Sequence, residues 1–146
     1  MSPAANRVAA ANFELRAHRP ARADDIALMR YALADWISAH GLTGDLAHDV
    51  ELATYEALIN TANHAYPAGI VGTVELHAHH QHDLIRITVT DHGRWQPPAA
   101  DPGQLRGRGL TLIRALADHT ILAPTDVGTT VTMTWYLTLP ETLGTS

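Results

Sequence analysis

A carboxylate and an amide stand four residues apart, at Glu56 and Asn60, within the stretch 51–64. This stretch is rich in Ala, Leu and Glu, and the pattern predicts a helix that Pro67 ends. Residues four apart share one face of a helix. Because the other faces are apolar, we expect a largely buried helix whose two polar side chains meet water, a metal ion or a ligand. A solvated polar stripe is the alternative with the same spacing.

An acidic residue beside a glycine follows the clearest predicted strand, 84–90, at Asp91 and Gly93. A carboxylate there can accept a hydrogen bond from a ligand amine, and the glycine allows a close backbone approach. Further along, Gly128 and Thr129 form a turn that leads into the last predicted strand. The threonine hydroxyl could help Asp91 to hold a base, directly or through water. Each pair is also compatible with an ordinary turn.

The segment 93–107 has no helical or strand periodicity and ends at a predicted helix start. Loops of more than about 12 residues are uncommon in small domains and are often functional lids. The free N–H groups of a helix start bind anions, and arginines attract polyphosphate. A dinucleotide fingerprint is excluded because Leu112 stands where its third glycine belongs. An ordinary glycine-rich helix start with solvated arginines is the alternative. The residues at this predicted helix start are Arg106, Gly107, Arg108, Gly109 and Leu110.

The composition limits the function classes that these residues can serve. The chain has 146 residues, 46% of them hydrophobic and 17% charged, as expected for one globular domain. Its net charge of -5 argues against direct nucleic-acid binding, which needs a basic face. The absence of Cys excludes disulfides and thiol catalysis, and the absence of Lys excludes a P-loop and Schiff-base chemistry. Without a membrane-spanning run or a signal pattern, we expect a cytoplasmic protein that does not enter membranes.

Strands and helices that do not alternate regularly must position the candidate residues. In the first half, the pattern predicts an edge strand over 13–17 and a helix capped by Asp24 or Asp25 that ends at Gly41. Asp45 is the expected cap of the central helix. The second half predicts strands over 71–77, 84–90, 119–122 and 130–139, connections over 79–83 and 124–128, and a helix over 109–118.

This order predicts an α+β fold, a two-layer sandwich of a mainly antiparallel sheet with about three helices on one face. We expect a flexible N-terminal arm over 1–12, one domain over 13–140 and a short tail over 141–146. Four histidines on the predicted hairpin make a zinc site a further alternative, although no cysteine is present to complete it. They are His77, His79, His80 and His82.

Taken in order, these motifs resemble the GHKL ATPase superfamily, which has the Bergerat or histidine-kinase-like fold. The small bacterial anti-sigma-factor serine/threonine kinases are the most similar group. The resemblance covers residues 13–139 and rests on four motifs in the right order: 56–60, 91–93, 106–110 and 128–129.

The resemblance implies a site for ATP and Mg²⁺. Asn60 would hold the magnesium ion, and Glu56 would act as the general base. Asp91, with Gly93 in the first glycine box, would receive the adenine amino group. The residues of the other two boxes would follow: backbone amides of Arg106, Gly107, Arg108, Gly109 and Leu110 on the phosphates, and Gly128 with Thr129 near the adenine.

The resemblance also implies a function and partners. The chain would be an anti-sigma factor that phosphorylates an anti-sigma-factor antagonist of the STAS type, and it would regulate transcription by partner switching with a sigma factor. A homodimer is implied in the same way. The alternative is a regulatory module that binds ATP or a partner without kinase activity. One departure is Arg94-Trp95, which stands where many relatives have a second glycine.

Overall fold

In the described part of the chain, five strands form one sheet in the order β1-β2-β3-β5-β4, and all four neighbouring pairs are antiparallel. The computed structural model describes residues 13–66, 69–93 and 110–137. The strands are β1 (Glu14–Pro20), β2 (Thr73–Gln81), β3 (Leu84–Asp91), β4 (His119–Thr125) and β5 (Gly128–Tyr136). The helices are α2 (Ala23–Ala39), α3 (Gly44–Asn60), the π-helical turn η1 (Thr61–Ala65) and a helix over 110–116.

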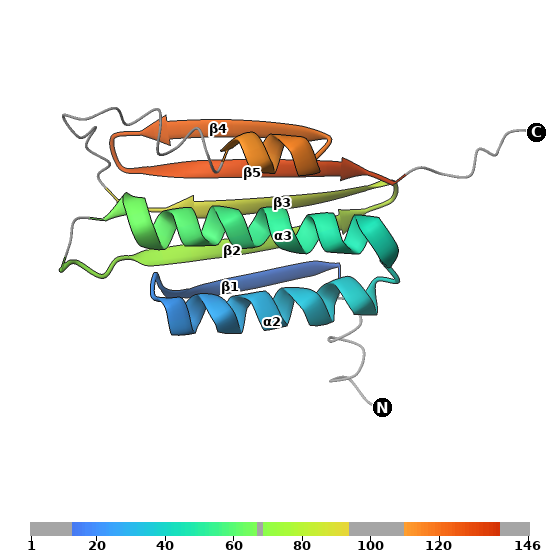
Figure 1. Ribbon diagram of the computed structural model, residues 1–146, viewed down its shortest axis with the longest axis horizontal. Coiled ribbons are helices and arrows are strands. Elements are labelled where there is room, and N and C mark those ends of the chain that lie inside the picture. The colour runs from blue at the N-terminus through green and yellow to red at the C-terminus, as the bar shows by residue number, and fades with distance from the viewer. Residues whose placement is uncertain (1–12, 67–68, 94–109, 138–146) are drawn as a thin grey trace, which may run out of the picture.

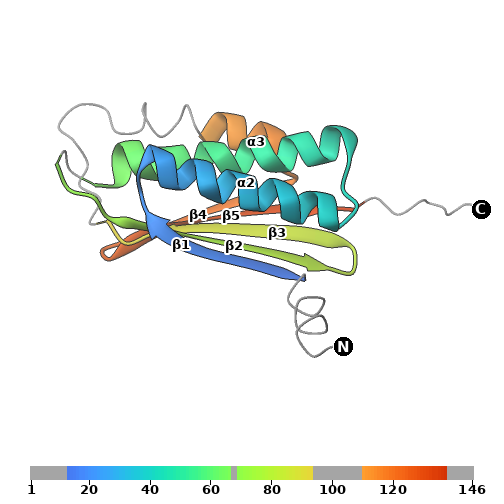
Figure 2. The same ribbon diagram turned by 90° about the horizontal axis from the view of Figure 1, so that it is seen from below.

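The described helices cover one face of the sheet, as Figure 2 shows, and the predicted two-layer α+β sandwich is therefore confirmed. Strand residues alternate between the two faces, so every second side chain points toward the helices. Full burial of one aliphatic side chain contributes about 1.5–3 kcal/mol, which makes this layer the main source of stability. Its buried strand residues include Val74, Leu76, Ala78, Ile85, Ile87, Val89, Met133 and Trp135.

The predicted helix caps are wrong by two or three residues. Arg22 precedes α2 and Thr43 precedes α3, and neither side chain makes a capping hydrogen bond. The acidic residues that were expected as caps lie in the first turns instead, where their charge still interacts favourably with the helix dipole. They are Asp24, Asp25 and Asp45.

The hairpin between β2 and β3 is tighter than the sequence predicts. Strand β2 continues to Gln81, so the predicted connection over 79–83 shrinks to a turn of two residues, His82 and Asp83. The polar residues at the end of β2 pair in regular register, for example His79 with Arg86. The turn between β4 and β5 shortens in the same way, because both strands extend into the predicted connection over 124–128.

Three predictions fall on residues outside the described ranges: the arm over 1–12, the tail over 141–146 and most of the segment 93–107. In the part of the chain that the structure describes, no helix is both long and apolar enough to cross a membrane.

Candidate functional site

Helix α3 carries Glu56 and Asn60 at the edge of its buried face. Both side chains are partly buried, so each has contact with the protein and with solvent. The helix is buried along one face rather than over most of its circumference, since Leu52 and Ile59 are only partly covered. This corrects the expectation of a largely buried helix. The face that packs on the sheet includes Val50, Ala53, Ala57 and Leu58.

The π-helical turn η1 continues α3 toward the end of β3. A Cβ atom on Gly93 would lie 2.1 Å from the carbonyl oxygen of Ala65, so the two backbones are in contact only because residue 93 is a glycine. Such turns are rare and are often found at functional sites. The contact places the C-terminal end of α3 beside the exit of β3, at the left of Figure 1.

Asp91 is the last residue of the inward-facing row of β3. Its side chain is 8% exposed, and its neighbours across the strands are Val74 and Thr129. The Oδ1 atom accepts hydrogen bonds from the backbone N–H of Gly93 at 3.0 Å and from that of Thr129 at 3.2 Å. Backbone donors to a carboxylate are strong hydrogen bonds, so the orientation of this carboxylate is fixed.

Gly128 packs directly against the Asp91 backbone. Its φ angle is +152°, and a Cβ atom there would lie 2.0 Å from the carbonyl oxygen of Asp91. Only glycine fits such a close approach. The two motifs that the sequence separates by 38 positions therefore form one structural unit, in which Thr129 is 7% exposed.

The structure brings two groups of predicted site residues to one end of the sheet. The first is the cluster of Asp91, Gly93, Gly128 and Thr129. The second is the C-terminal half of α3 with Glu56 and Asn60, which reaches the cluster through η1 (Figure 1). Leu110 is the first described residue of the helix that ends at residue 116. The remaining predicted residues, Arg106, Gly107, Arg108 and Gly109, lie outside the described residues.

Sequence reasoning missed Tyr66, which follows η1. Its hydroxyl donates to the carbonyl oxygen of Thr73 at 2.6 Å and accepts from the backbone N–H groups of Thr73 at 3.2 Å and His92 at 3.0 Å. All partners are backbone atoms, 7 and 26 positions further along the chain, so no side-chain pattern could have indicated them. The only sequence signal is an aromatic residue immediately after the central helix.

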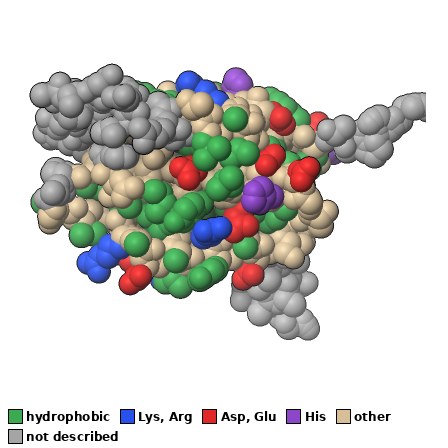
Figure 3. All heavy atoms as spheres, in the orientation of Figure 1, with side chains coloured by type: hydrophobic (Ala, Val, Ile, Leu, Met, Phe, Trp, Pro, Cys, Tyr) green, Lys and Arg blue, Asp and Glu red, His purple; other side chains and the backbone are tan. Residues whose placement is uncertain are grey.

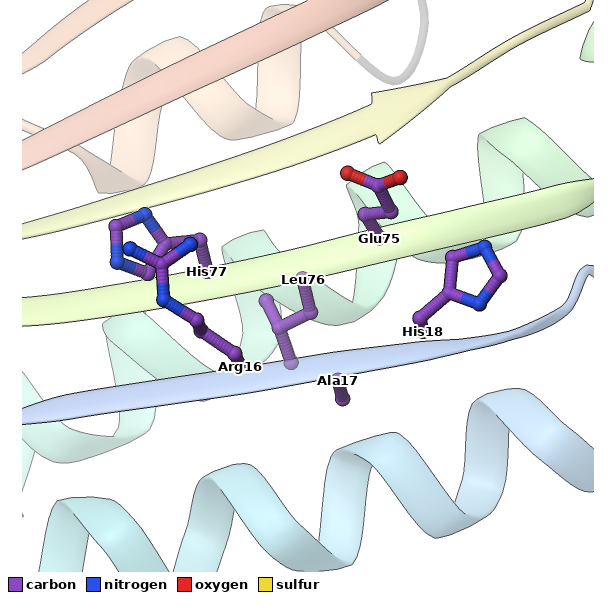
Figure 4. A pocket seen from close by; sticks show the side chains of 6 residues that line it. All are labelled: Arg16, Ala17, His18, Glu75, Leu76 and His77. Atoms are coloured by element: carbon purple, nitrogen blue, oxygen red, sulfur yellow. The ribbon is translucent and has the colours of Figure 1, made fainter. Parts of the chain in front are cut away.

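A separate cavity of about 250 Å³ lies on strands β1 and β2, as Figure 4 shows. Its polar lining residues alternate with the inward-facing Leu76 and Ala78, so they belong to the sheet face away from the helices. It is therefore not part of the cluster around Asp91. Its lining residues are Arg16, Ala17, His18, Glu75, Leu76 and His77.

The histidines of the hairpin divide between the two faces of the sheet. The Nε2 atom of His77 forms a hydrogen bond of 3.1 Å with Oε1 of Glu14, and this bond is the main cause of the lowered pKa of Glu14. His80 faces the other way and lies 2.7 Å from His40. Among the described residues, no three His, Cys, Asp or Glu side chains gather as a metal site.

A sequence profile of the histidine kinase-like ATPase domain matches residues 19–135. The chain therefore belongs to the histidine kinase-like, or GHKL, ATPase family, and the resemblance identified from the sequence is confirmed. It is similar to the serine-protein kinase RsbW of Staphylococcus aureus strains JH9 and Newman. Each is 30% identical over 133 residues, which cover 81% of this chain and 83% of the relative.

A solved structure of the RsbU and RsbW domains of a Mycobacterium tuberculosis protein has the same fold, with a TM-score of 0.65 and 21% sequence identity. The match covers 84% of this chain and 32% of the mycobacterial chain.

Proposed function

We propose that the chain is a Mg-ATP-dependent serine/threonine protein kinase that acts as an anti-sigma factor. Family membership supports ATP use, and the similarity to RsbW supports a serine-protein kinase. The observation that carries the proposal is the cluster of Asp91, Gly93, Gly128 and Thr129 beside the end of the helix that bears Glu56.

The residues of the cluster fit the adenine end of ATP. The backbone bonds to Asp91 orient a carboxylate that would accept the exocyclic amine of adenine. Gly93 and Gly128 keep the surrounding backbone close, with no side chain in the way. Thr129 would lie beside the base, as its position next to Asp91 allows.

The residues of α3 fit the chemistry at the phosphate end. Mg-ATP would supply the transferred phosphoryl group. Glu56 would take the proton of the serine or threonine hydroxyl of the target, and such a base contributes about 10²–10⁴-fold. The side-chain oxygen of Asn60 is a ligand of the type that Mg²⁺ prefers. The backbone amides of the stretch 106–110 would hold the phosphates.

The partners in this proposal are a sigma factor and a STAS-type antagonist, bound in the cytoplasm by a homodimer that regulates transcription without touching nucleic acid. Figure 3 shows hydrophobic and acidic side chains intermixed on the helix-bearing face. On helix α2, Leu28 is 48% exposed and Tyr31 is 65% exposed. Exposed apolar side chains beside charges are suited to a protein partner.

The test is transfer of radiolabelled phosphate from ATP to purified candidate antagonists. The wild type should label its antagonist, and Glu56→Gln should bind ATP but transfer at least about 100-fold more slowly because it lacks the base. Glu51→Gln is the matched control on the same helix. It loses only the ion pair with Arg30, whose N–O distance is 3.1 Å, and should transfer at the wild-type rate.

Two results would contradict the proposal. Wild-type protein that binds ATP but labels no antagonist would be a nucleotide- or partner-binding module rather than a kinase. Equal transfer by wild type and Glu56→Gln would show that Glu56 is not the base.

A further inference from the structure

We propose that Tyr66 is a positioning residue for the adenine end of the site, acting through the backbone that follows Asp91. The inference rests on the proposed function, because it takes ATP as the ligand. It concerns a residue that lies outside the four motifs and that is connected to them only in the folded chain.

The phenol of Tyr66 joins three segments of the chain. One is its own position after η1, the second is the start of β2 at Thr73, and the third is the exit of β3 at His92. A tyrosine hydroxyl has one hydrogen to donate and lone pairs to accept, and here it makes one donated and two accepted bonds. Backbone groups thus satisfy the full hydrogen-bonding capacity of the hydroxyl.

Two glycines hold the tyrosine ring in place. A Cβ atom on Gly72 would lie 2.0 Å from Cε1 and from Cζ of Tyr66, and one on Gly93 would lie 3.1 Å from Cε1. The ring therefore lies against the backbone of both glycines. Because neither glycine carries a side chain that could push the ring away, the hydroxyl is kept within reach of His92.

The bond to His92 completes the support of the Asp91 carboxylate. His92 stands between Asp91 and Gly93, and the N–H of Gly93 donates to Asp91 Oδ1. The turn is thus fixed at its middle by Tyr66 and at its end by Asp91. Loss of the hydroxyl frees the middle of the turn, so the Gly93 donor and the carboxylate lose their fixed geometry. A hydrogen bond weakens steeply when its geometry is poor, so the carboxylate would hold the adenine amine less well.

The test compares Tyr66→Phe with the wild type in three measurements. In nucleotide-free protein, amide hydrogen exchange at His92 and Gly93 should become about tenfold faster, because the His92 N–H loses its acceptor, the phenol oxygen, and the turn that carries Gly93 is freed. In calorimetry, the Kd for ATP should rise about fivefold to tenfold. In the phosphate-transfer assay, kcat at saturating ATP should stay the same, because Glu56 and Asn60 are untouched.

Three further variants separate positioning from general stability. Gly72→Ala keeps the hydroxyl but displaces the ring, and should raise the Kd for ATP in the same direction. Tyr136→Phe removes a hydroxyl from an exposed ring at the other end of β5 and should leave the Kd unchanged. Ile37→Val removes a methyl group from the core and should lower Tm without changing the Kd.

Unchanged exchange at His92 and Gly93 in Tyr66→Phe would overturn the inference whether or not ATP binds. The same holds if the Kd for ATP changes no more than it does in Ile37→Val. If the wild type binds no ATP, the proposed function fails, and the assignment of Tyr66 to an adenine site fails with it. Faster exchange together with a raised Kd and an unchanged kcat supports the positioning role.

Discussion

Asp91 shows how a single side chain depends on its backbone surroundings. It is buried at the end of a row of apolar residues, where an unsatisfied carboxylate would cost several kcal/mol by rough estimate. The N–H groups of Gly93 and Thr129 satisfy it and at the same time orient it. The group that we propose to recognise the adenine amine is thereby held in one position before the ligand arrives.

The charge of Asp91 can be tested without loss of its backbone bonds. In Asp91→Asn, the amide oxygen can still accept from Gly93 and Thr129, so the fold should persist. The amide nitrogen replaces an acceptor by a donor, which opposes the adenine amine. We expect ATP to bind about 10–100-fold more weakly in calorimetry, the loss typical of a charged hydrogen bond. Asp83→Asn, in the exposed β2–β3 turn, is the control, and equal affinities for all three proteins would exclude this adenine site.

Gly128 provides a test of close backbone packing. A methyl group at this position would collide with the Asp91 carbonyl oxygen, so Gly128→Ala should lose both stability and ATP affinity. Gly44→Ala is the control, because Gly44 also has a positive φ but no atom lies within 4 Å of the place that its methyl group would take. It should lose about 1 kcal/mol of stability and no ATP affinity. Thermal unfolding would measure the stability of both variants, and calorimetry their affinity for ATP. Equal ATP affinities for Gly128→Ala and Gly44→Ala would contradict the role of this close backbone contact.

At the residue scale, the sequence indicated which residues form the candidate cluster around Asp91, but not every residue that holds this cluster in place. Asp91, Gly93, Gly128 and Thr129 could be selected because their residue types have a local meaning in turns and ligand contacts. Tyr66 could not, because its partners are backbone atoms that only the folded chain brings near it.

At the element scale, the end of α2 meets β2 through a histidine pair. His40 and His80 lie with their Nδ1 atoms 2.7 Å apart, and the His40 ring also packs on Trp36, with ring centroids 4.4 Å apart. Burial lowers the pKa of His80, and the nearby His40 and His79 lower it further. The pair is therefore favoured while His80 is neutral.

This contact predicts a pH dependence of stability. His80 has a lower pKa in the folded chain than in the unfolded chain, so its contribution is present above the unfolded pKa and is lost as the pH falls through the folded value. Between about pH 7 and pH 5.5, Tm should fall more steeply for the wild type than for His80→Gln. His82→Gln, in the exposed turn, should keep the wild-type slope. Parallel curves for wild type and His80→Gln would contradict the assignment.

Element types were predictable because apolar residues recur with periods of 3.6 in helices and 2 in strands. Element ends were less predictable. The last residues of β2 are polar on both faces, so alternation gives no signal there, although the partner strand still pairs with them. The change from α3 to the π-helical turn η1 also leaves no side-chain signature, since it is a change of backbone hydrogen bonding.

At the scale of the whole molecule, the strand order of the sheet brings the candidate site residues together. β3 and β5 are neighbours in the sheet although the segment 92–127 separates them in the chain. Their antiparallel pairing places the end of one beside the start of the other, and thus Asp91 beside Thr129. Helix α3 covers the sheet face toward which Asp91 points, and it ends at the same end of the sheet as Asp91 (Figure 1). One end of the sandwich therefore brings together residues that we propose to bind opposite ends of a nucleotide.

Calorimetric titration of the full chain with ATP, in the presence and absence of Mg²⁺, tests this central claim most directly. We expect saturable binding to one site per chain, at least about tenfold tighter with Mg²⁺, and loss of the magnesium effect in Asn60→Ala. Asn63→Ala, an exposed amide three residues further along, should behave as the wild type. Absence of ATP binding, or a magnesium effect that survives in Asn60→Ala, would contradict the claim that this end of the sandwich holds Mg-ATP.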